Sequence, residues 1–181
     1  LRDRRAANLV KGISPTRLNE IWGADTTLVR TDAGPLFLAA LLDLHSRKVV
    51  GWSLSHRNDE ALALACLRRA LESRRPSSGW IHHSDQGSPY TATGYTRLVR
   101  DRGGRLSFSA PGRPTDNAIV ESFFRTLKLE EVDRNRYRCR LEAESSLKEY
   151  IENIYNATRM HSALEYRSPD QHESRQHGAP R

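Results

Sequence analysis

The sequence predicts an α/β domain with a mixed five-stranded sheet and helices packed on both faces. Three strand-like runs come first along the chain, and helices then alternate with two further strand-like runs. This order is typical of a sheet that is partly antiparallel and partly parallel. The length of 181 residues suffices for one domain with a real core and is too short for two.

The first three strands are expected to form an antiparallel meander. They are predicted at residues 22–30, 36–44 and 48–55, where β-branched and apolar side chains accumulate. Turn-forming residues separate them, with Gly34-Pro35 in the first connection and His45-Ser-Arg47 in the second. Connections this short join antiparallel neighbours, so the three runs are expected side by side.

The second half of the predicted sheet is interrupted by helices. Glycine and proline mark where these elements end, because neither continues a regular helix. The expected elements are a helix capped by Asn58 or Asp59 that ends before Pro76, a strand at 80–83, a helix at 93–102 and a strand at 105–109.

Two amphipathic helices complete the predicted domain. The first begins near Asp116, and at about 100° per residue its apolar side chains share one arc while Glu121 and Lys128 lie on another. The apolar arc is expected to pack on the sheet, so Glu121 should point away from it. The last helix has apolar residues at helical spacing that are expected to face the core: Leu147, Tyr150, Ile151, Ile154 and Tyr155.

Three acidic residues lie where a functional carboxylate is expected. Asp25 is in the middle of a strand, where an unpaired carboxylate is disfavoured. Asp85 follows a short buried strand, at the end of the sheet where α/β proteins bind ligands. Glu121 projects from the first turns of a helix whose other side is apolar. Taken singly, each is equally well explained as a surface residue or a helix cap.

Three carboxylates brought together favour metal-dependent phosphoryl transfer. Their repulsion requires cations, and a ligand set of oxygens alone suits Mg²⁺ or Mn²⁺. Two such ions about 4 Å apart activate an attacking oxygen and stabilise a leaving oxygen. Glycosidase chemistry needs only two carboxylates, and the sequence lacks the Asp-x-Asp-x-Asp-Gly run of a calcium loop. Cys66 and Cys139 have no zinc-ligand spacing.

The charge balance favours a polyanionic partner. The chain has 29 Lys and Arg against 22 Asp and Glu, a net charge of +7, and nucleic acid is the obvious candidate. The basic residues cluster at 2–17, 97–113 and 134–140, although any one cluster alone is explained as solvated surface. The longest apolar run, at 36–42, is far shorter than a membrane-spanning helix, which needs about 20 residues. A cytoplasmic protein with no membrane partner is therefore expected.

Five motifs extend in order over about residues 17–170: Trp22-Gly-Ala-Asp-Thr-Thr27, Leu41–Trp52, His83–Thr91, Gly112–Glu130 and Tyr155–Leu164. They resemble the DDE transposases of bacterial insertion sequences, whose catalytic domain is related to retroviral integrase. Asp85 and Glu121 are separated by 35 residues, as in that family's pattern.

The resemblance implies a ribonuclease H-like fold in which Asp25, Asp85 and Glu121 are catalytic and hold two Mg²⁺ ions, which Mn²⁺ can replace. Lys128 matches the family's basic residue seven positions after the glutamate, which implies a DNA contact near the cut. Further expected DNA contacts are Arg113, Arg125, Asn117 and Arg159, with His83 and His161 in supporting roles. The alternatives are a surface lysine for Lys128, a satisfied buried histidine for His83, a helix-start residue for Asn117, and a structural clasp for Arg159 with His161.

The implied activity is hydrolysis of a phosphodiester at the end of a DNA element, followed by transfer of the 3′-hydroxyl to target DNA. Related enzymes act as multimers on paired DNA ends, so a homo-oligomer on DNA at the bacterial nucleoid is expected. Two alternatives stay open. One is a truncated, inactive relic that still binds DNA, and the other is a ribonuclease H-type nuclease that cleaves RNA–DNA hybrids.

The expected domain boundaries place the catalytic core at 19–170. Residues 1–18 are interpreted as a basic arm or the remnant of an upstream domain, and 171–181 as a polar tail. Family members carry an upstream helix-turn-helix that recognises the ends of the element, and residues 1–18 could not form one. Leu1 comes first and Met160 is the only methionine, which suggests a fragment, an unusual start codon, or a domain cut from a longer reading frame. The helix-turn-helix is then expected on an upstream domain or protein.

Overall fold

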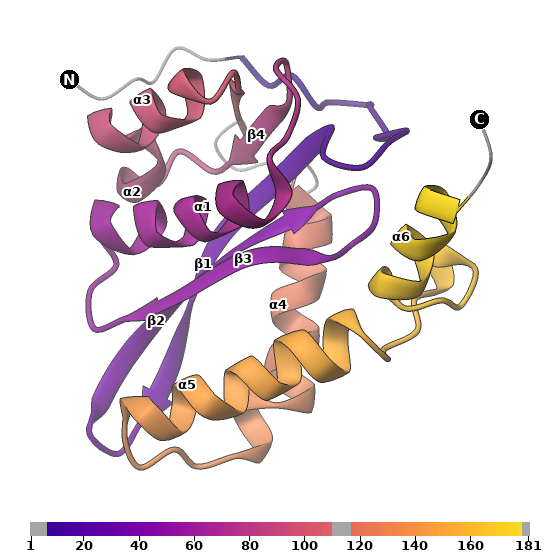
Figure 1. The fold of residues 1–181 in the computed structure, drawn as a ribbon. Coiled ribbons are helices and arrows are strands. Elements are labelled where there is room, and N and C mark those ends of the chain that lie inside the picture. The colour runs from indigo at the N-terminus through magenta and orange to yellow at the C-terminus, as the bar shows by residue number, and fades with distance from the viewer. Residues whose placement is uncertain (1–6, 110–116, 179–181) are drawn as a thin grey trace.

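The fold is a mixed sheet between two layers of helices, in a computed structural model that describes residues 7–109 and 117–178 (Figure 1). The strand order is β3-β2-β1-β4-β5. Strands β1 to β3 are antiparallel neighbours, whereas β4 pairs parallel with both β1 and β5. The predicted five-stranded mixed sheet is therefore confirmed. Its strands are β1 (Ile21–Thr31), β2 (Gly34–Asp43), β3 (Val49–Ser55), β4 (Ile81–Ser84) and β5 (Arg105–Phe108).

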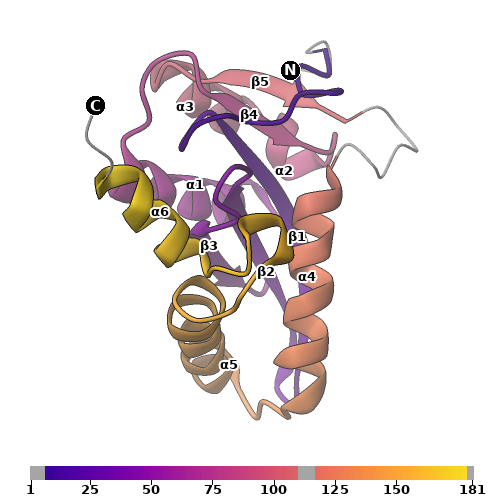
Figure 2. The same ribbon diagram turned by 90° about the vertical axis from the view of Figure 1, so that its right-hand side faces the viewer.

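Helices cover both faces of the sheet, as predicted (Figure 2). One face packs against α1 (Glu60–Arg74), α2 (Ser88–Thr91) and α3 (Thr93–Asp101). The other packs against α4 (Ala118–Glu130) and α5 (Arg140–Lys148), which a π-helix, η3 (Glu149–Asn156), continues. The shorter elements are η2 (Val132–Arg134), η4 (Ser162–Leu164) and α6 (Pro169–Gly178). No helix in the described ranges is long and apolar enough to cross a membrane.

Successive β1 residues alternate between the two apolar cores. Trp22 and Ala24 belong to the core under α1 and α3, whereas Ile21 and Val29 belong to the core under α4 and α5. This is the period of two that a strand imposes on its side chains. The alternation decides which face of the sheet each polar residue of β1 occupies.

Helix α1 begins where the sequence predicts, because Asp59 caps it. The Asp59 carboxylate accepts a hydrogen bond of 3.1 Å from the backbone N–H of Leu62. The helix ends at Arg75, which adopts a left-handed conformation at φ 46°. One glycine lets this helix approach the sheet, since a Cβ at Gly51 would lie 2.7 Å from the carbonyl oxygen of Cys66.

The predicted apolar stripe of the last long helix is wrong at one position. Ile154 is 43% exposed, although it has α-helical spacing from the buried residues before it. Residues 149–156 are π-helical, and i→i+5 hydrogen bonds widen the turn and change the spacing along a face. Asn156 occupies an inward position instead, and its amide bonds to the backbone N–H and carbonyl of Val49 at 2.9 and 3.0 Å.

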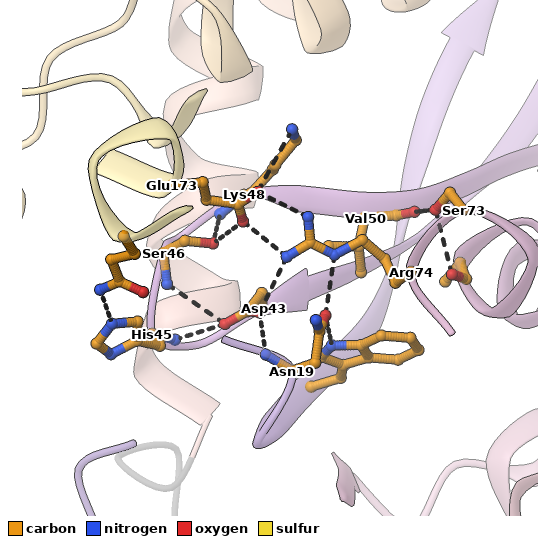
Figure 3. Close-up of polar contacts among 12 residues, drawn as sticks. Asn19, Asp43, His45, Ser46, Lys48, Val50, Ser73, Arg74 and Glu173 are labelled. Atoms are coloured by element: carbon orange, nitrogen blue, oxygen red, sulfur yellow. Dashed lines mark hydrogen bonds and ion pairs between the residues drawn. The ribbon is translucent and has the colours of Figure 1, made fainter. Parts of the chain in front are cut away.

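The expected polar tail at 171–181 is wrong for residues 171–178, because they belong to α6. Glu173 is buried and forms an ion pair of 2.7 Å with Arg74 of α1, which in turn lies 3.4 Å from Asp43 of β2 (Figure 3). The Ser46 hydroxyl donates a hydrogen bond of 2.6 Å to Glu173. Polar contacts, with little apolar burial, therefore hold α6 against the domain.

Part of the expected N-terminal arm also packs on the domain. Val10 is 8% exposed and belongs to the core under α4 and α5. The backbone N–H of Leu9 donates a hydrogen bond of 2.8 Å to the Ser107 hydroxyl on β5. Residues 9 and 10 are thus fixed to the sheet in the absence of a helix or strand of their own.

Candidate active site

Asp25 lies on the α4 face of the sheet. Trp22 and Ala24 are buried under α1 and α3, so the alternation of β1 turns Gly23 and Asp25 toward α4. A Cβ at Gly23 would lie 2.6 Å from Cγ2 of Val120, so only glycine allows this close approach of α4. The start of α4 therefore lies directly beside the part of β1 that carries Asp25.

Asp85 is placed by the parallel pairing of β4 with β1. Gly23 pairs with His83 in this register, so the chain leaves β4 next to the part of β1 that carries Asp25. Adjacent strands are separated by about 5 Å. Asp85 itself is exposed beyond the end of β4, and its Oδ1 accepts a hydrogen bond of 2.9 Å from the backbone N–H of Gly87.

Glu121 lies on the exposed side of α4, as its helix register predicts. It lines an open cavity of about 530 Å³ between β1 and α4. Arg125 and Lys128 follow Glu121 along the helix and line the same cavity, and Asp25 lines the opposite wall. Asp85 is not among the lining residues. The other lining residues are Thr26, Thr27, Phe124, Leu129 and Asp133.

The electrostatic surroundings of Asp25 connect the three predicted carboxylates. The pKa of Asp25 is raised to about 6, mainly by burial, and the backbone N–H of Thr26, 2.7 Å from Oδ1, opposes this shift. The negative charges of Asp85 and Glu121 contribute to the same rise, and the positive charge of Lys128 opposes it. All three charged neighbours are therefore close enough to Asp25 to change its ionisation.

The carboxylates are neighbours, but they do not form a compact ligand set. Within residues 7–109 and 117–178, no group of three or more His, Cys, Asp or Glu side chains could hold a metal ion as it stands. The donor chemistry nevertheless fits a hard divalent cation, because the donors are all carboxylate oxygens. A cation would also offset the repulsion that raises the pKa of Asp25.

Two residues expected to act at the site are buried and bonded within the protein. Asn117 is 7% exposed, and its side-chain amide donates a hydrogen bond of 3.3 Å to the Ala24 carbonyl. This position does not fit a direct DNA contact, and it fits the alternative of a helix-start residue. His83 is fully buried, with its ring nitrogens 2.9 and 3.0 Å from the hydroxyls of Ser107 and Ser109. That is the environment of a satisfied buried histidine.

Arg159 is engaged in the predicted clasp. It forms an ion pair of 2.8 Å with Glu130 at the end of α4, and the Tyr150 hydroxyl donates a hydrogen bond of 2.6 Å to the same carboxylate. His161 packs edge-on against Tyr155 at a ring distance of 5.1 Å. Neither residue lines the cavity that holds Glu121. Arg113 lies outside the described residues.

The sequence analysis missed two residues beside Asp25. The Thr26 hydroxyl hydrogen-bonds to the Tyr90 hydroxyl at 2.8 Å, which links β1 to α2 next to the site. Tyr90 lies within the motif His83–Thr91, so a signal for it existed. Asp133 lines the cavity from η2. In the sequence it lies between the acidic pair Glu130-Glu131 and the basic run at 134–140, and no motif distinguishes it from these neighbouring charges.

The matches to known families agree with this geometry. A family model described as an integrase core domain matches residues 15–114, and a second model with the same description matches residues 102–169. The chain belongs to the integrase core domain family. Enzymes of this family generally use divalent metal ions.

The integrase core also has close relatives among bacterial transposases. It is 42% identical over 163 residues to a transposase for insertion sequence element IS904 from Lactococcus lactis subsp. lactis (strain IL1403). The match covers 90% of the chain and 64% of that transposase. The chain thus spans less than two thirds of the length of this relative.

Solved structures confirm the predicted ribonuclease H-like architecture of the integrase core. The catalytic core domain of BIV integrase is similar with a TM-score of 0.63 and 20% identity, over 88% of this chain and 97% of that one. A simian T-cell lymphotropic virus intasome in complex with PP2A regulatory subunit B56 gamma contains a chain with a TM-score of 0.71 and 17% identity. That match covers 100% of this chain and 61% of the other. Because the sequence identities of these two matches are only 17% and 20%, the matches support the fold and nothing further.

Proposed function

We propose that the chain is the catalytic part of a DDE-type transposase. It would hydrolyse a phosphodiester at the end of a DNA element and join the freed 3′-hydroxyl to target DNA. The observation that carries this proposal is the cavity between β1 and α4, where Asp25 faces Glu121 and Lys128, with Asp85 close enough to affect the ionisation of Asp25. Three acidic side chains, from β1, from just beyond the end of β4 and from α4, with a cation beside them, suit phosphoryl transfer.

Asp25, Asp85 and Glu121 would hold the metal, for which we propose a pair of Mg²⁺ ions that Mn²⁺ can replace. Divalent ions between carboxylates and a phosphodiester supply charge stabilisation and activate the attacking oxygen. The Thr26 N–H holds one oxygen of Asp25 and so directs the other toward the cavity. Asn117 and Gly23 position α4, because one bonds to β1 and the other permits close packing.

Lys128 and Arg125 would bind the DNA backbone beside the reacting phosphate. Both line the same cavity as Glu121, and Arg125 is exposed on the outer side of α4. Positive side chains at this position neutralise phosphate charge and hold the strand near the carboxylates. Arg113 remains a proposed DNA contact on the motif match alone.

The proposed partners are DNA and further copies of the chain. The net charge of +7 suits a nucleic-acid partner, and the viral relative is part of an intasome. Recognition of the element's ends would come from an upstream helix-turn-helix domain or protein, and the place of action would be the bacterial nucleoid. The catalytic unit would extend beyond 19–170, because residues 9–10 and 169–178 pack on it.

A nicking assay on supercoiled plasmid tests the proposal. With Mg²⁺ or Mn²⁺ the wild-type chain should nick DNA, and Glu121→Gln should lose this activity. Glu152→Gln is the matched control, because Glu152 is an exposed glutamate of η3 outside the site. It should retain activity.

Each alternative has a distinct outcome in this assay. Equal nicking by wild type and Glu121→Gln would refute the assigned site. DNA binding with no nicking in either metal would identify a relic. Cleavage of an RNA–DNA hybrid without cleavage of duplex DNA would identify a nuclease of the ribonuclease H type.

A further inference from the structure

A second cavity lies on the other flank of α4 from the one that holds Glu121. Its volume is about 430 Å³, and it is lined from three separate parts of the chain. Arg47 comes from the turn between β2 and β3, Ser122 and Thr126 come from α4, and Arg159, His161 and Tyr166 come from the segment after η3. Figure 2 shows this segment, in yellow, passing beside α4. Most of the polar side chains in this wall are hydrogen-bond donors or cations.

Two nitrogens in this wall are buried and unpaired. Nε of Arg47 and Nε2 of His161 are inaccessible to solvent and have no hydrogen-bond partner among the described residues. A buried polar atom without a partner is uncommon in folded proteins and costs stability. Arg47 also has a left-handed backbone at φ 64°, which is uncommon for a residue with a side chain. An acceptor that reached these atoms through a small side-chain movement would satisfy Nε of Arg47, and also Nε2 of His161 in the tautomer that carries the proton there.

The local charge favours an anionic acceptor. Burial lowers the pKa of Arg47, and burial with the positive charges of Arg159 and Arg47 lowers the pKa of His161 to about 4. Glu130 is the one carboxylate among the groups that influence His161, and it is already engaged by Arg159 and Tyr150. The cavity thus holds a half-buried guanidinium, and its lining within the described part of the chain includes no carboxylate.

We propose that this cavity binds a phosphate group of the DNA backbone. This proposal rests on the proposed function, because it requires DNA as the substrate. Arg47 and the neutral imidazole of His161 would turn toward the entering phosphate and donate from their unpaired nitrogens to its oxygens, and Ser122 lies at the exposed side of the same cavity. Tyr166 is 71% exposed and offers a surface for the adjoining sugar or base.

The cavity is placed where it can act together with the carboxylates. Ser122 directly follows Glu121, and the two side chains differ by about 100° around α4. Thr126 likewise follows Arg125, so the two cavities flank the exposed crest of one helix. A DNA strand that crosses the exposed face of α4 would have one phosphate near Glu121 and another in the second cavity.

Titration with inorganic phosphate tests the site in the absence of DNA or catalysis. At constant ionic strength, phosphate should produce saturable NMR shifts at His161 and Ser122 in the wild-type chain, and chloride should not. Ser122→Glu places a negative charge on an exposed position at the cavity and should weaken phosphate binding at least tenfold. No saturable shift at these residues would overturn the proposal.

The salt dependence of duplex DNA binding tests the source of the phosphate. Loss of one phosphate contact lowers the slope of log K against log salt by about 0.9, which is the change expected for Arg47→Gln. Arg47→Lys should recover part of it. Arg68→Gln removes the same charge from an exposed position on α1 and should leave the slope unchanged. Thermal melts establish that each variant is folded.

The possible outcomes separate this proposal from the proposed function. If Arg47→Gln and Ser122→Glu fold and keep the wild-type slope, the DNA site is refuted, even when the wild type nicks plasmid. Phosphate binding with an unchanged slope would assign the cavity to free phosphate and refute the DNA part. A lowered slope in a chain whose wild type does not nick DNA would support this site and refute the catalytic function.

Discussion

Asp25 and Asp43 are carboxylates on neighbouring strands with opposite surroundings. Burial raises the pKa of both. Asp43 is fully buried in a closed network (Figure 3). Its carboxylate accepts backbone N–H hydrogen bonds and pairs with Arg74 at 3.4 Å, and Arg74 pairs with Glu173 at 2.7 Å. The backbone donors are Asn19, His45 and Ser46, at 2.6, 2.9 and 3.3 Å.

Asp25 has almost none of this compensation. One backbone N–H, from Thr26, bonds to it, and two of its charged neighbours are carboxylates. A buried charge that is paired and bonded is a structural feature, whereas one left beside like charges costs stability. The difference teaches that burial alone does not separate the carboxylate of the proposed metal site from a structural one. The two differ in the sign of the charges beside them.

Asp25→Asn should remove the function that we propose for Asp25. Removing the carboxylate should reduce metal-dependent nicking by on the order of 10³-fold or more, as for other residues that act as a unit. Folding stability should stay equal or rise, because one charge of a repelling group is lost. Nicking rates and thermal melts measure the two effects.

The matched control for Asp25→Asn is Asp101→Asn, an exposed aspartate at the end of α3. It should change neither nicking nor stability. A large loss of stability in Asp25→Asn would contradict the comparison, because it would mean that Asp25 is a structural residue like Asp43.

Arg74→Met should disrupt the buried network around Asp43 and lower the stability of the fold. It leaves Asp43 and Glu173 buried without their cation, which costs about 3–5 kcal/mol of unfolding free energy. Arg97→Met removes an exposed pair with Asp101 and should cost at most about 0.5 kcal/mol. Urea denaturation compares them. Equal stability of the two variants would show that the network of Figure 3 contributes little.

The pH dependence of stability should sharpen the contrast. The pKa of Asp25 is about 6 in the folded chain and 3.8 ordinarily, so folding favours its protonated form. Its contribution to stability is therefore complete below about pH 4 and is lost as the pH rises through 6. In the absence of metal, Asp25→Asn should gain about 1 kcal/mol over wild type across this range, after discounting for partial exposure.

Thermal melts of both proteins between pH 4 and 7 measure this gain. Because a divalent cation favours the charged carboxylate, added Mn²⁺ should abolish the gain at pH 7. A difference between wild type and Asp25→Asn that stays constant with pH would contradict the raised pKa.

The sequence predicted most of the fold because its signals are periodic or local. Alternation marked the strands, and helix register put Glu121 on the exposed side of α4. The parts that could not be predicted depend on contacts between distant residues. Glu173 and Arg74 hold α6 in place across 99 positions of sequence, without an apolar stripe. Ile154 was misplaced because a π-helix has no recognised pattern in side-chain spacing.

The candidate site also has a part that the sequence predicted and a part that depends on contacts between distant residues. Asp25, Asp85 and Glu121 were predicted from their motifs and from strand and helix positions, and the structure brings Asp85 and Glu121 close enough to Asp25 to affect its ionisation. Asn117 and His83 belong to those motifs too, but bonds to Ala24, Ser107 and Ser109 hold them inside the protein. A motif selects residues that matter for a site without separating those that face the substrate from those that support it.

Lys128→Gln should have the smallest effect. It tests Lys128 as the cation near Asp25, in the position that Arg74 has near Asp43. Lys128 lowers the pKa of Asp25 through its charge alone, with no ion pair to Asp25 among the described contacts, whereas Arg74 contacts Asp43 directly. Loss of Lys128 should weaken DNA binding by about 1 kcal/mol, roughly fivefold. It should also lower the slope of log K against log salt by about 0.9, the change expected for one phosphate contact.

The control is Lys148→Gln, at an exposed position on α5, which should leave the affinity and the slope unchanged. Fluorescence anisotropy with a duplex oligonucleotide at several salt concentrations measures both quantities. Equal slopes for the two variants would make Lys128 an ordinary surface lysine, and the cation that faces Asp25 would have to come from the metal alone.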